Sequence, residues 1–203
     1  MDPVIEKLVS KFEIGEKLAH KNLLIYPLLG SNGNKVQYIT LDEALADDKI
    51  EIKEVSEDGS VPDLKVENKS DENILLIDGE ELIGAKQNRI INTTILLKKK
   101  SKSKIPVSCV EESRWSYNSE KFSSSGSTSP SSMRSRKARA VSANLMESAG
   151  KSYRANQGEV WNEVDRIAKF AKVDSPTGAM KDVFDSRKKE MDEYLKNLST
   201  LRG

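Results

Sequence analysis

The segment from Val61 to Glu111 constrains the fold more than any other part of the chain, because strand patterns recur there at short intervals. Polar turns separate four apolar stretches with strand character, at residues 64–67, 73–77, 89–97 and 104–111. Parallel pairing needs a crossover of about a dozen residues or more between strands, and these turns leave little room for one. We therefore expect these stretches to form an antiparallel sheet or sandwich.

Helical patterns surround this segment and complete the predicted architecture. Thr40 and Glu43 form a capping box ahead of a short helix. Apolar residues at helical spacing run from Gly158 to about Val173 and from Met180 to the C-terminus. The predicted fold class is α+β, with an antiparallel sheet or sandwich core over about residues 20–115, flanking helices and a C-terminal helical hairpin.

Two stretches have a biased composition. Residues 123–132 hold seven serines with one glycine and one proline, which cannot bury enough apolar surface to offset the entropy of ordering, so we predict a Ser-rich mobile loop there. Residues 98–104 hold five lysines in seven positions. These lysines either contact phosphates or, in the interpretation that we favour, keep a hairpin tip soluble and protect a sheet edge.

The overall composition excludes several classes of protein. The 203 residues carry 33 Lys and Arg against 32 Asp and Glu, so a net charge of +1 gives no strong case for nucleic acid as a partner. One cysteine and one histidine are too few for a disulfide framework or a structural zinc site, and we predict no metal site. No apolar run approaches the roughly 18 residues of a membrane span, so we expect a cytoplasmic protein without a membrane partner. Cofactors and the oligomeric state stay open.

Residues 78–89 form the most unusual segment, because acids, bases and amides are concentrated there between two strongly apolar strands. Two glycines permit tight turns or close approach to a ligand. The alternative is a buried network of ion pairs and amides that holds a corner of the sheet together. The candidates are Glu80 or Glu81 as general base, Lys86 or Arg89 as anion clamp, and Gln87 or Asn88 as a reader of a planar group.

A second group of candidates lies at the end of the last predicted strand, where Cys109, Glu111 and Arg114 are close in sequence. Glu111 is a third candidate general base and Arg114 a candidate ligand-binding residue. We expect Cys109 to be buried and inert, because the only histidine, His20, is far away in sequence and no motif connects the two.

Two further expectations concern pockets. We expect Arg89 and Glu81 to point into one shared polar pocket, lined by the strand that carries Cys109 and Glu111, because so many polar groups between apolar strands cannot all be solvated. A third candidate site lies at a helix start, where Glu159 and Trp161 could face the same pocket. The alternative, which we favour, is that Trp161 belongs to the apolar core.

Several segments together resemble one known family, the ADP-ribosylglycohydrolase-and-rhodanese-phosphatase-associated protein domain family. The block from Gly79 to Arg89 is the most diagnostic of them. The resemblance implies a soluble prokaryotic-type domain with genomic links to ADP-ribose processing, and it implies no established activity or catalytic residue. The resembling segments, in chain order, are 22–28, 38–55, 78–94, 105–111 with Arg114 and Trp115, and 157–161.

Similar proteins continue beyond a region like Tyr194–Leu198 with a strand and a last helix. We therefore expect residues 1–203 to be a single domain that lacks a C-terminal strand–helix unit. Two functions of different class remain. One is accessory binding of an anionic, nucleotide-like ligand related to ADP-ribose, and the other is hydrolysis of such a substrate with a glutamate as general base. The absence of a recognisable catalytic triad or metal cluster favours binding.

Overall fold

The computed structural model describes residues 3–30, 36–56 and 58–198. They belong to two compact units, one formed by residues 1–36 and 187–203 and the other by residues 37–186. Helices and mainly antiparallel sheets occur together, so the predicted α+β class is confirmed. The prediction of a single domain over residues 1–203, truncated at its C-terminus, stays a prediction.

The smaller unit consists of a helix, two short antiparallel ladders and the end of the last helix. The turn between β2 and β3 contacts the end of the last helix, where Lys21 Nζ lies 2.7 Å from Glu193 Oε2 and the Tyr194 hydroxyl donates to Asn22 Oδ1. The ladders pair β1 with β4 and β2 with β3. Its elements are α1 (Pro3–Val9), β1 (Glu13–Ile14), β2 (Leu18–His20), β3 (Leu23–Ile25), β4 (Leu28–Leu29) and the end of α5 (Met180–Leu198).

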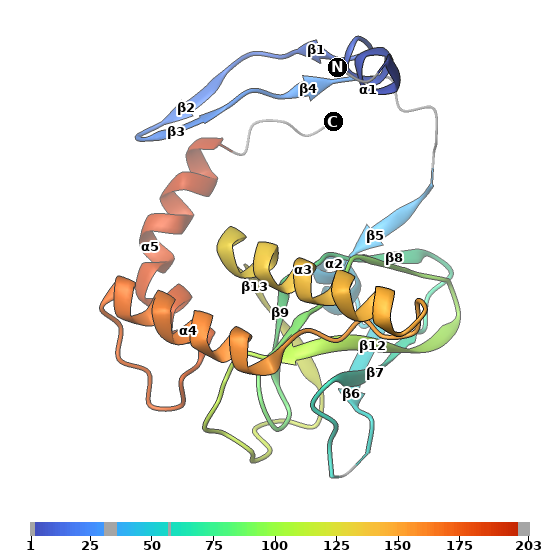
Figure 1. The fold of residues 1–203 in the computed structure, drawn as a ribbon, viewed down its shortest axis with the longest axis vertical. Helices are drawn as coiled ribbons and strands as arrows, with labels where there is room; N and C mark the ends of the chain where they lie inside the picture. Colours follow the sequence, from blue (N-terminus) through green and yellow to red (C-terminus); the bar gives the residue numbers. More distant parts are fainter. Residues whose placement is uncertain (1–2, 31–35, 57, 199–203) are drawn as a thin grey trace. The chain divides into compact units, whose positions relative to one another are not determined.

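A curled, fully antiparallel sheet of six strands dominates the larger unit (Figure 1). Its spatial order is β13-β9-β10-β12-β7-β6. Ion pairs bridge the two edges, since Lys121, just before β13, lies 2.6 Å from Glu51 of β6, and Lys53 lies 2.9 Å from Glu120. The strands are β6 (Ile50–Glu54), β7 (Asp63–Asn68), β9 (Glu80–Gly84), β10 (Arg89–Ile91), β12 (Ser101–Cys109) and β13 (Phe122–Thr128).

A second sheet holds three strands in the order β11-β8-β5, and only its β5–β8 pair is parallel. The predicted capping box is present at α2, where the Glu43 amide donates to Thr40 Oγ1 and the Thr40 amide donates to Glu43 Oε2. The elements are β5 (Tyr38–Thr40), α2 (Leu41–Ala46), β8 (Asn73–Leu76) and β11 (Ile95–Leu97).

Two apolar clusters cover opposite sides of the six-stranded sheet. The larger cluster includes Ile52, Leu82 and Val107 and continues into the second sheet. The smaller one joins Ile90 and Val110 of the sheet region to three helices near the C-terminus. These helices are α3 (Ser131–Glu147), α4 (Gln157–Ala171) and α5, and α4 with α5 supplies the predicted C-terminal helices (Figure 1).

The Ser-rich segment, predicted as a mobile loop over residues 123–132, forms a strand up to Thr128 and the start of α3 from Ser131. Residues Phe122–Thr128 make up β13, which pairs antiparallel with β9 and contains an irregularity between Ser124 and Thr128. Phe122 is buried and supplies the apolar anchor that the serines lack. Backbone hydrogen bonds to β9 replace apolar burial at this sheet edge, and composition alone cannot predict them.

Candidate functional site

Glu54 and Arg89 form a buried pair inside the curl of the six-stranded sheet. Glu54 ends β6 on the face of Ile52, and Arg89 begins β10 directly opposite Leu82 of β9 and Cys109 of β12. Arg89 has no exposed surface and the Glu54 side chain is 4% exposed. Arg89 Nη2 lies 3.8 Å from Glu54 Oε1, which is too long for a hydrogen bond. The two charges therefore compensate each other without saturating their hydrogen-bonding groups.

Most polar atoms of this pair lack a hydrogen-bond partner. Arg89 Nη1 donates to Gln87 Oε1 at 3.0 Å. Both Glu54 oxygens and the Arg89 Nε and Nη2 atoms have no partner within the part of the chain that the structure describes. Burial lowers the pKa of the Arg89 guanidinium from its ordinary value, although the nearby Cys109 and Glu54 act in the opposite direction. Buried polar atoms normally have hydrogen-bond partners, so four unpartnered polar atoms in one buried pair are unusual.

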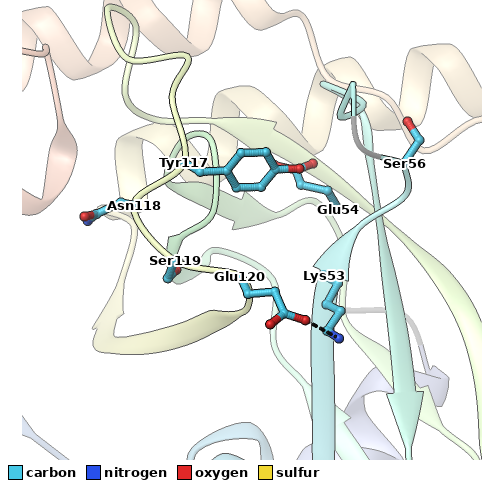
Figure 2. A pocket seen from close by; sticks show the side chains of 7 residues that line it. All are labelled: Lys53, Glu54, Ser56, Tyr117, Asn118, Ser119 and Glu120. Atoms are coloured by element: carbon cyan, nitrogen blue, oxygen red, sulfur yellow. Dashed lines mark ion pairs between the residues drawn. The ribbon is translucent and has the colours of Figure 1, made fainter.

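A cavity of about 590 Å³ opens beside this pair, and Glu54 is part of its wall. Figure 2 shows Tyr117 and Glu54 reaching toward each other from facing walls, with Lys53 paired to Glu120 near the rim. This volume lies within the range of ligand sites, which is about 300–1,000 Å³. The lining residues are Lys53, Glu54, Ser56, Tyr117, Asn118, Ser119 and Glu120.

Aromatic rings and cations gather next to the cavity. Lys86 Nζ lies 5.4 Å from the ring centre of Trp115 and 5.1 Å from that of Tyr117, and the Arg89 guanidinium lies 5.7 Å from the Trp115 ring. The backbone of Gly59 passes close to the side chains of Trp115 and Glu54. Its φ is +79°, and a Cβ at this position would lie 3.3 Å from Trp115 and 3.5 Å from Glu54. Trp115 keeps 48% of its surface exposed, so a planar ligand has access to the ring.

Other residues of the 78–89 block enter an internal network around Glu111. The Glu111 carboxylate accepts from Arg114 Nε at 2.9 Å and Nη2 at 2.7 Å, from the Asn88 amide at 3.0 Å and from Thr177 Oγ1 at 3.0 Å. Burial raises the pKa of Glu111, but these donors outweigh burial and hold the pKa below its ordinary value. Gln87 Nε2 donates to the Glu111 carbonyl oxygen at 2.7 Å. The carboxylate is thus well satisfied within the protein.

A second cavity, of about 310 Å³, borders this network and is lined by Asn88, Glu111 and Arg114 among others. The structure therefore brings together four predicted site residues, Gln87, Asn88, Glu111 and Arg114, through hydrogen bonds within the chain. Their roles toward a ligand stay predictions. Lys86 and Arg89 lie instead on the side of the larger cavity.

Glu81 lies on the opposite face of the sheet from Arg89, so the predicted shared pocket is wrong. Glu81 pairs with Ile90 across β9 and β10, whereas Arg89 pairs with Leu82. Directly opposed residues share a face and neighbours along a strand alternate, so the two charged side chains must diverge. Glu81 belongs with the helix-covered side and Arg89 with the interior of the curl.

Glu81 is fully buried, and neither of its oxygens has a hydrogen-bond partner among the described residues. Burial raises its pKa to about 7. Lys181 lowers that pKa in part, while Asp185 and Glu111 raise it. Burial thus favours the protonated form of Glu81 far above the pH at which a solvated glutamate ionises.

Glu80 differs from its neighbour. It is half-buried, and its Oε2 accepts from the Ile77 amide at 2.8 Å, which fixes the turn before β9. Burial raises the pKa of Glu80, and the Ile77 amide opposes that rise. The Glu80 carboxylate therefore stabilises the turn that precedes β9.

The remaining sequence candidates are placed apart from the cavity. Cys109 is buried, and burial raises the pKa of its thiol to about 11, which agrees with an inert thiol. Glu159 and Trp161 line two different cavities, so the predicted common pocket at the start of α4 is not formed. No group of histidine, cysteine and acidic residues suited to a metal ion occurs among the described residues.

Sequence reasoning missed two residues of the cavity, Glu54 and Tyr117. Glu54 carried a signal, because Ile50, Ile52 and Glu54 share one face of β6 and an acid occupies the third position of an otherwise apolar series. Tyr117 lies in a polar stretch between strands, and no pattern there indicates its direction.

The fold and this buried pair define an α+β protein with a curled antiparallel sheet and a cavity at one end of it. The family model for the ARG and Rhodanese-Phosphatase-superfamily-associated Protein (ARPP-1) domain matches residues 11–203, and the chain belongs to this family. The family is an uncharacterised associated domain, so membership confirms the resemblance seen in the sequence and assigns no activity. Comparison with curated proteins and with solved structures finds no match. Within the described residues, no helix has the length and apolar character needed to cross a membrane.

Proposed function

We propose that the cavity beside Glu54 and Arg89 binds an anionic, nucleotide-like ligand related to ADP-ribose, and that the protein is an accessory binding domain. The observation that carries this proposal is the set of four polar atoms of Glu54 and Arg89 that lie buried without hydrogen-bond partners among the described residues. Because Glu54 also lines the cavity, a ligand there can supply donors to its carboxylate.

The chemistry of the surrounding side chains selects the class of ligand. A carboxylate accepts hydrogen bonds only, so Glu54 favours ligand hydroxyl or amine groups such as those of a ribose or an exocyclic amine. Trp115 and Tyr117 offer ring faces for a planar base, and stacking of a base on an aromatic side chain contributes about 1–3 kcal/mol. Lys86 lies over both rings and supplies a cation for a phosphate.

Calorimetric titration with ADP-ribose tests this proposal. The wild-type chain should bind with saturation, and Glu54→Gln should weaken binding about tenfold or more, because a charged acceptor becomes a neutral amide. Glu67→Gln is the matched control, since Glu67 lies on the neighbouring β7, pairs with exposed Lys102 and does not line the cavity. Equal affinities for wild type and Glu54→Gln, or no binding by the wild type, would contradict the proposal.

Hydrolysis of the same class of ligand is the second candidate, and Glu81 is the observation that favours it. Among the three candidate bases, Glu81 is the one whose pKa burial raises to about 7, where a general base is most effective. However, Glu81 faces away from the Arg89 side of the sheet, so a ligand beside Glu54 and Arg89 does not reach it. Chromatography of ADP-ribose after incubation separates the two functions. Product formation that is lost in Glu81→Gln would establish the hydrolase, and binding without product would establish the accessory domain.

A further inference from the structure

Another cleft in the larger unit, of about 410 Å³, has three cations among its seven lining residues and shares no lining residue with the cavity beside Glu54. Lys104 of β12 forms one wall, and Lys151 and Arg154 of the segment between α3 and α4 form the other. Asp63 is the single carboxylate in the lining, so three cations face one anion. None of the three cations forms an ion pair with a carboxylate among the residues that the structure describes. The full lining is Asp63, Lys104, Pro106, Lys151, Ser152, Tyr153 and Arg154.

Backbone contacts hold the segment that carries Lys151 and Arg154 in place. Asn144 Nδ2 donates to the Arg154 carbonyl oxygen at 2.7 Å, and Asn92 Nδ2 donates to the Tyr153 carbonyl oxygen at 3.1 Å. Asn92 is itself held, because the Ser108 hydroxyl donates to its Oδ1 at 2.8 Å. The cleft is therefore formed before any ligand arrives, which lowers the entropy cost of binding.

The same segment is also anchored at its start. The amides of Lys151 and Ser152 both donate to Ser148 Oγ, at 3.2 Å and 2.9 Å. Three asparagine or serine side chains thus fix the backbone on both sides of Tyr153. Lys151, Tyr153 and Arg154 of this anchored segment line the cleft together with Lys104 of β12.

The strand register adds a like-charge contact that an anion would relieve. Lys65 of β7 lies directly opposite Lys53 of β6 on one side and Lys104 of β12 on the other. Lys53 is compensated by Glu51 and Glu120. Lys65 and Lys104 have no such compensation in the described chain, and like charges directly opposite each other destabilise a sheet. An anion beside Lys104 would offset this repulsion.

We propose that this cleft binds a small phosphorylated molecule, with Lys104, Lys151 and Arg154 as the phosphate-binding residues and Tyr153 as the wall beside it. Arginine supplies a fork of donors that matches phosphate oxygens, and the lysines supply compact charges. The cleft volume suits a molecule of nucleotide or sugar-phosphate size. An extended polyanion is disfavoured, because the acids and bases of the whole chain nearly cancel. This site also gives a role to Lys104, the last of the five clustered lysines.

Calorimetric titration of the full chain with inorganic pyrophosphate, at a constant ionic strength of about 0.1 M, tests the proposal. Wild-type protein should bind with saturation, and Arg154→Gln and Lys104→Gln should each weaken binding about tenfold or more. Lys102→Gln is the matched control. It removes the same charge from the same strand, but Lys102 pairs with Glu67 and does not line the cleft. Glu54→Gln should leave pyrophosphate binding at this cleft unchanged, which separates it from the nucleotide site.

Three results would overturn the proposal. The first is no pyrophosphate binding beyond that of chloride at equal ionic strength. The second is an equal loss in Lys102→Gln and Lys104→Gln, which would mean diffuse charge attraction only. The third is binding of a single-stranded oligonucleotide without binding of pyrophosphate, which would make the face a surface for an extended polyanion. If pyrophosphate binds, adenosine diphosphate and a sugar phosphate as further arms distinguish a nucleotide from other phosphorylated molecules.

Discussion

Arg89 Nη2 lies 3.8 Å from Glu54 Oε1 although both side chains are buried. The two opposite charges therefore compensate each other, while both Glu54 oxygens and two of the Arg89 nitrogens have no hydrogen-bond partner among the described residues. A buried pair that served stability alone would be expected to satisfy its remaining donors and acceptors within the protein. The Glu111–Arg114 pair nearby does so, with two hydrogen bonds between the partners at 2.9 and 2.7 Å. The contrast between the two pairs is the basis for assigning the first to a ligand.

Removal of Arg89 tests the charge compensation. In Arg89→Met the Glu54 carboxylate stays buried without its counter-charge, so the free energy of unfolding should fall by about 3–5 kcal/mol. The double variant Arg89→Met with Glu54→Leu should regain most of that loss, because an apolar pair of similar volume avoids the desolvation cost. Urea denaturation measures both. A single variant as stable as wild type would show that the two charges are not coupled.

The raised pKa of Glu81 predicts a pH dependence of stability. The folded pKa of about 7 exceeds the ordinary glutamate value of 4.5, so folding favours the protonated carboxyl. The stabilisation is complete below about pH 4.5 and is lost as pH rises through about 7, by about 3 kcal/mol in total. Glu81→Gln should therefore match wild type near pH 4.5 and exceed its stability at pH 8. If the free energy of unfolding changes with pH in the same way for wild type and Glu81→Gln between pH 4.5 and 8, the raised pKa of Glu81 is contradicted.

The Glu111 network predicts a structural effect of its loss. Glu111→Ala removes the acceptor of four hydrogen bonds and leaves Arg114, which is 15% exposed, without its carboxylate, so stability should fall by about 3–5 kcal/mol. Thr177→Val removes one of the four bonds and should cost only about 1 kcal/mol. Thermal denaturation of both variants gives the ranking. If Glu111→Ala is as stable as wild type, the structural role of Glu111 is contradicted and this residue is again a candidate general base.

The buried Cys109 predicts low thiol reactivity. Its pKa is raised to about 11, so almost no thiolate exists at pH 8, and the side chain is also inaccessible. Native protein should react with a thiol-specific reagent only as fast as it unfolds, and the same chain in denaturant should react at once. Fast labelling of the native protein, at the rate of a free thiol, would show that Cys109 is reachable from solvent.

Much of the fold could be predicted from local patterns. The short polar turns after Val61 predicted the antiparallel strands, and Thr40 with Glu43 predicted the start of α2. The strand β13 could not be predicted, because its serines are held by backbone bonds to β9 and by Phe122 rather than by their own side chains.

The candidate site was predicted in part. The polar block at 78–89 does supply Lys86 and Arg89 to the cavity side. Glu81 was misplaced, because the register that sets its face depends on where β9 meets β10, and a shift of one residue reverses every side chain. Tyr117 and Glu54 come together only through the curl of the sheet, which joins segments that are distant in sequence.

Fluorescence of Trp115 tests the central claim most directly. The chain contains two tryptophans, so Trp161→Phe leaves Trp115 as the single reporter beside the cavity. Titration with ADP-ribose should quench or shift its emission with saturation, and the same titration in Glu54→Gln should need about tenfold more ligand or more. Emission that stays unchanged at ligand concentrations that saturate calorimetric binding, or identical titrations with and without the Glu54 substitution, would contradict a ligand site at this cavity.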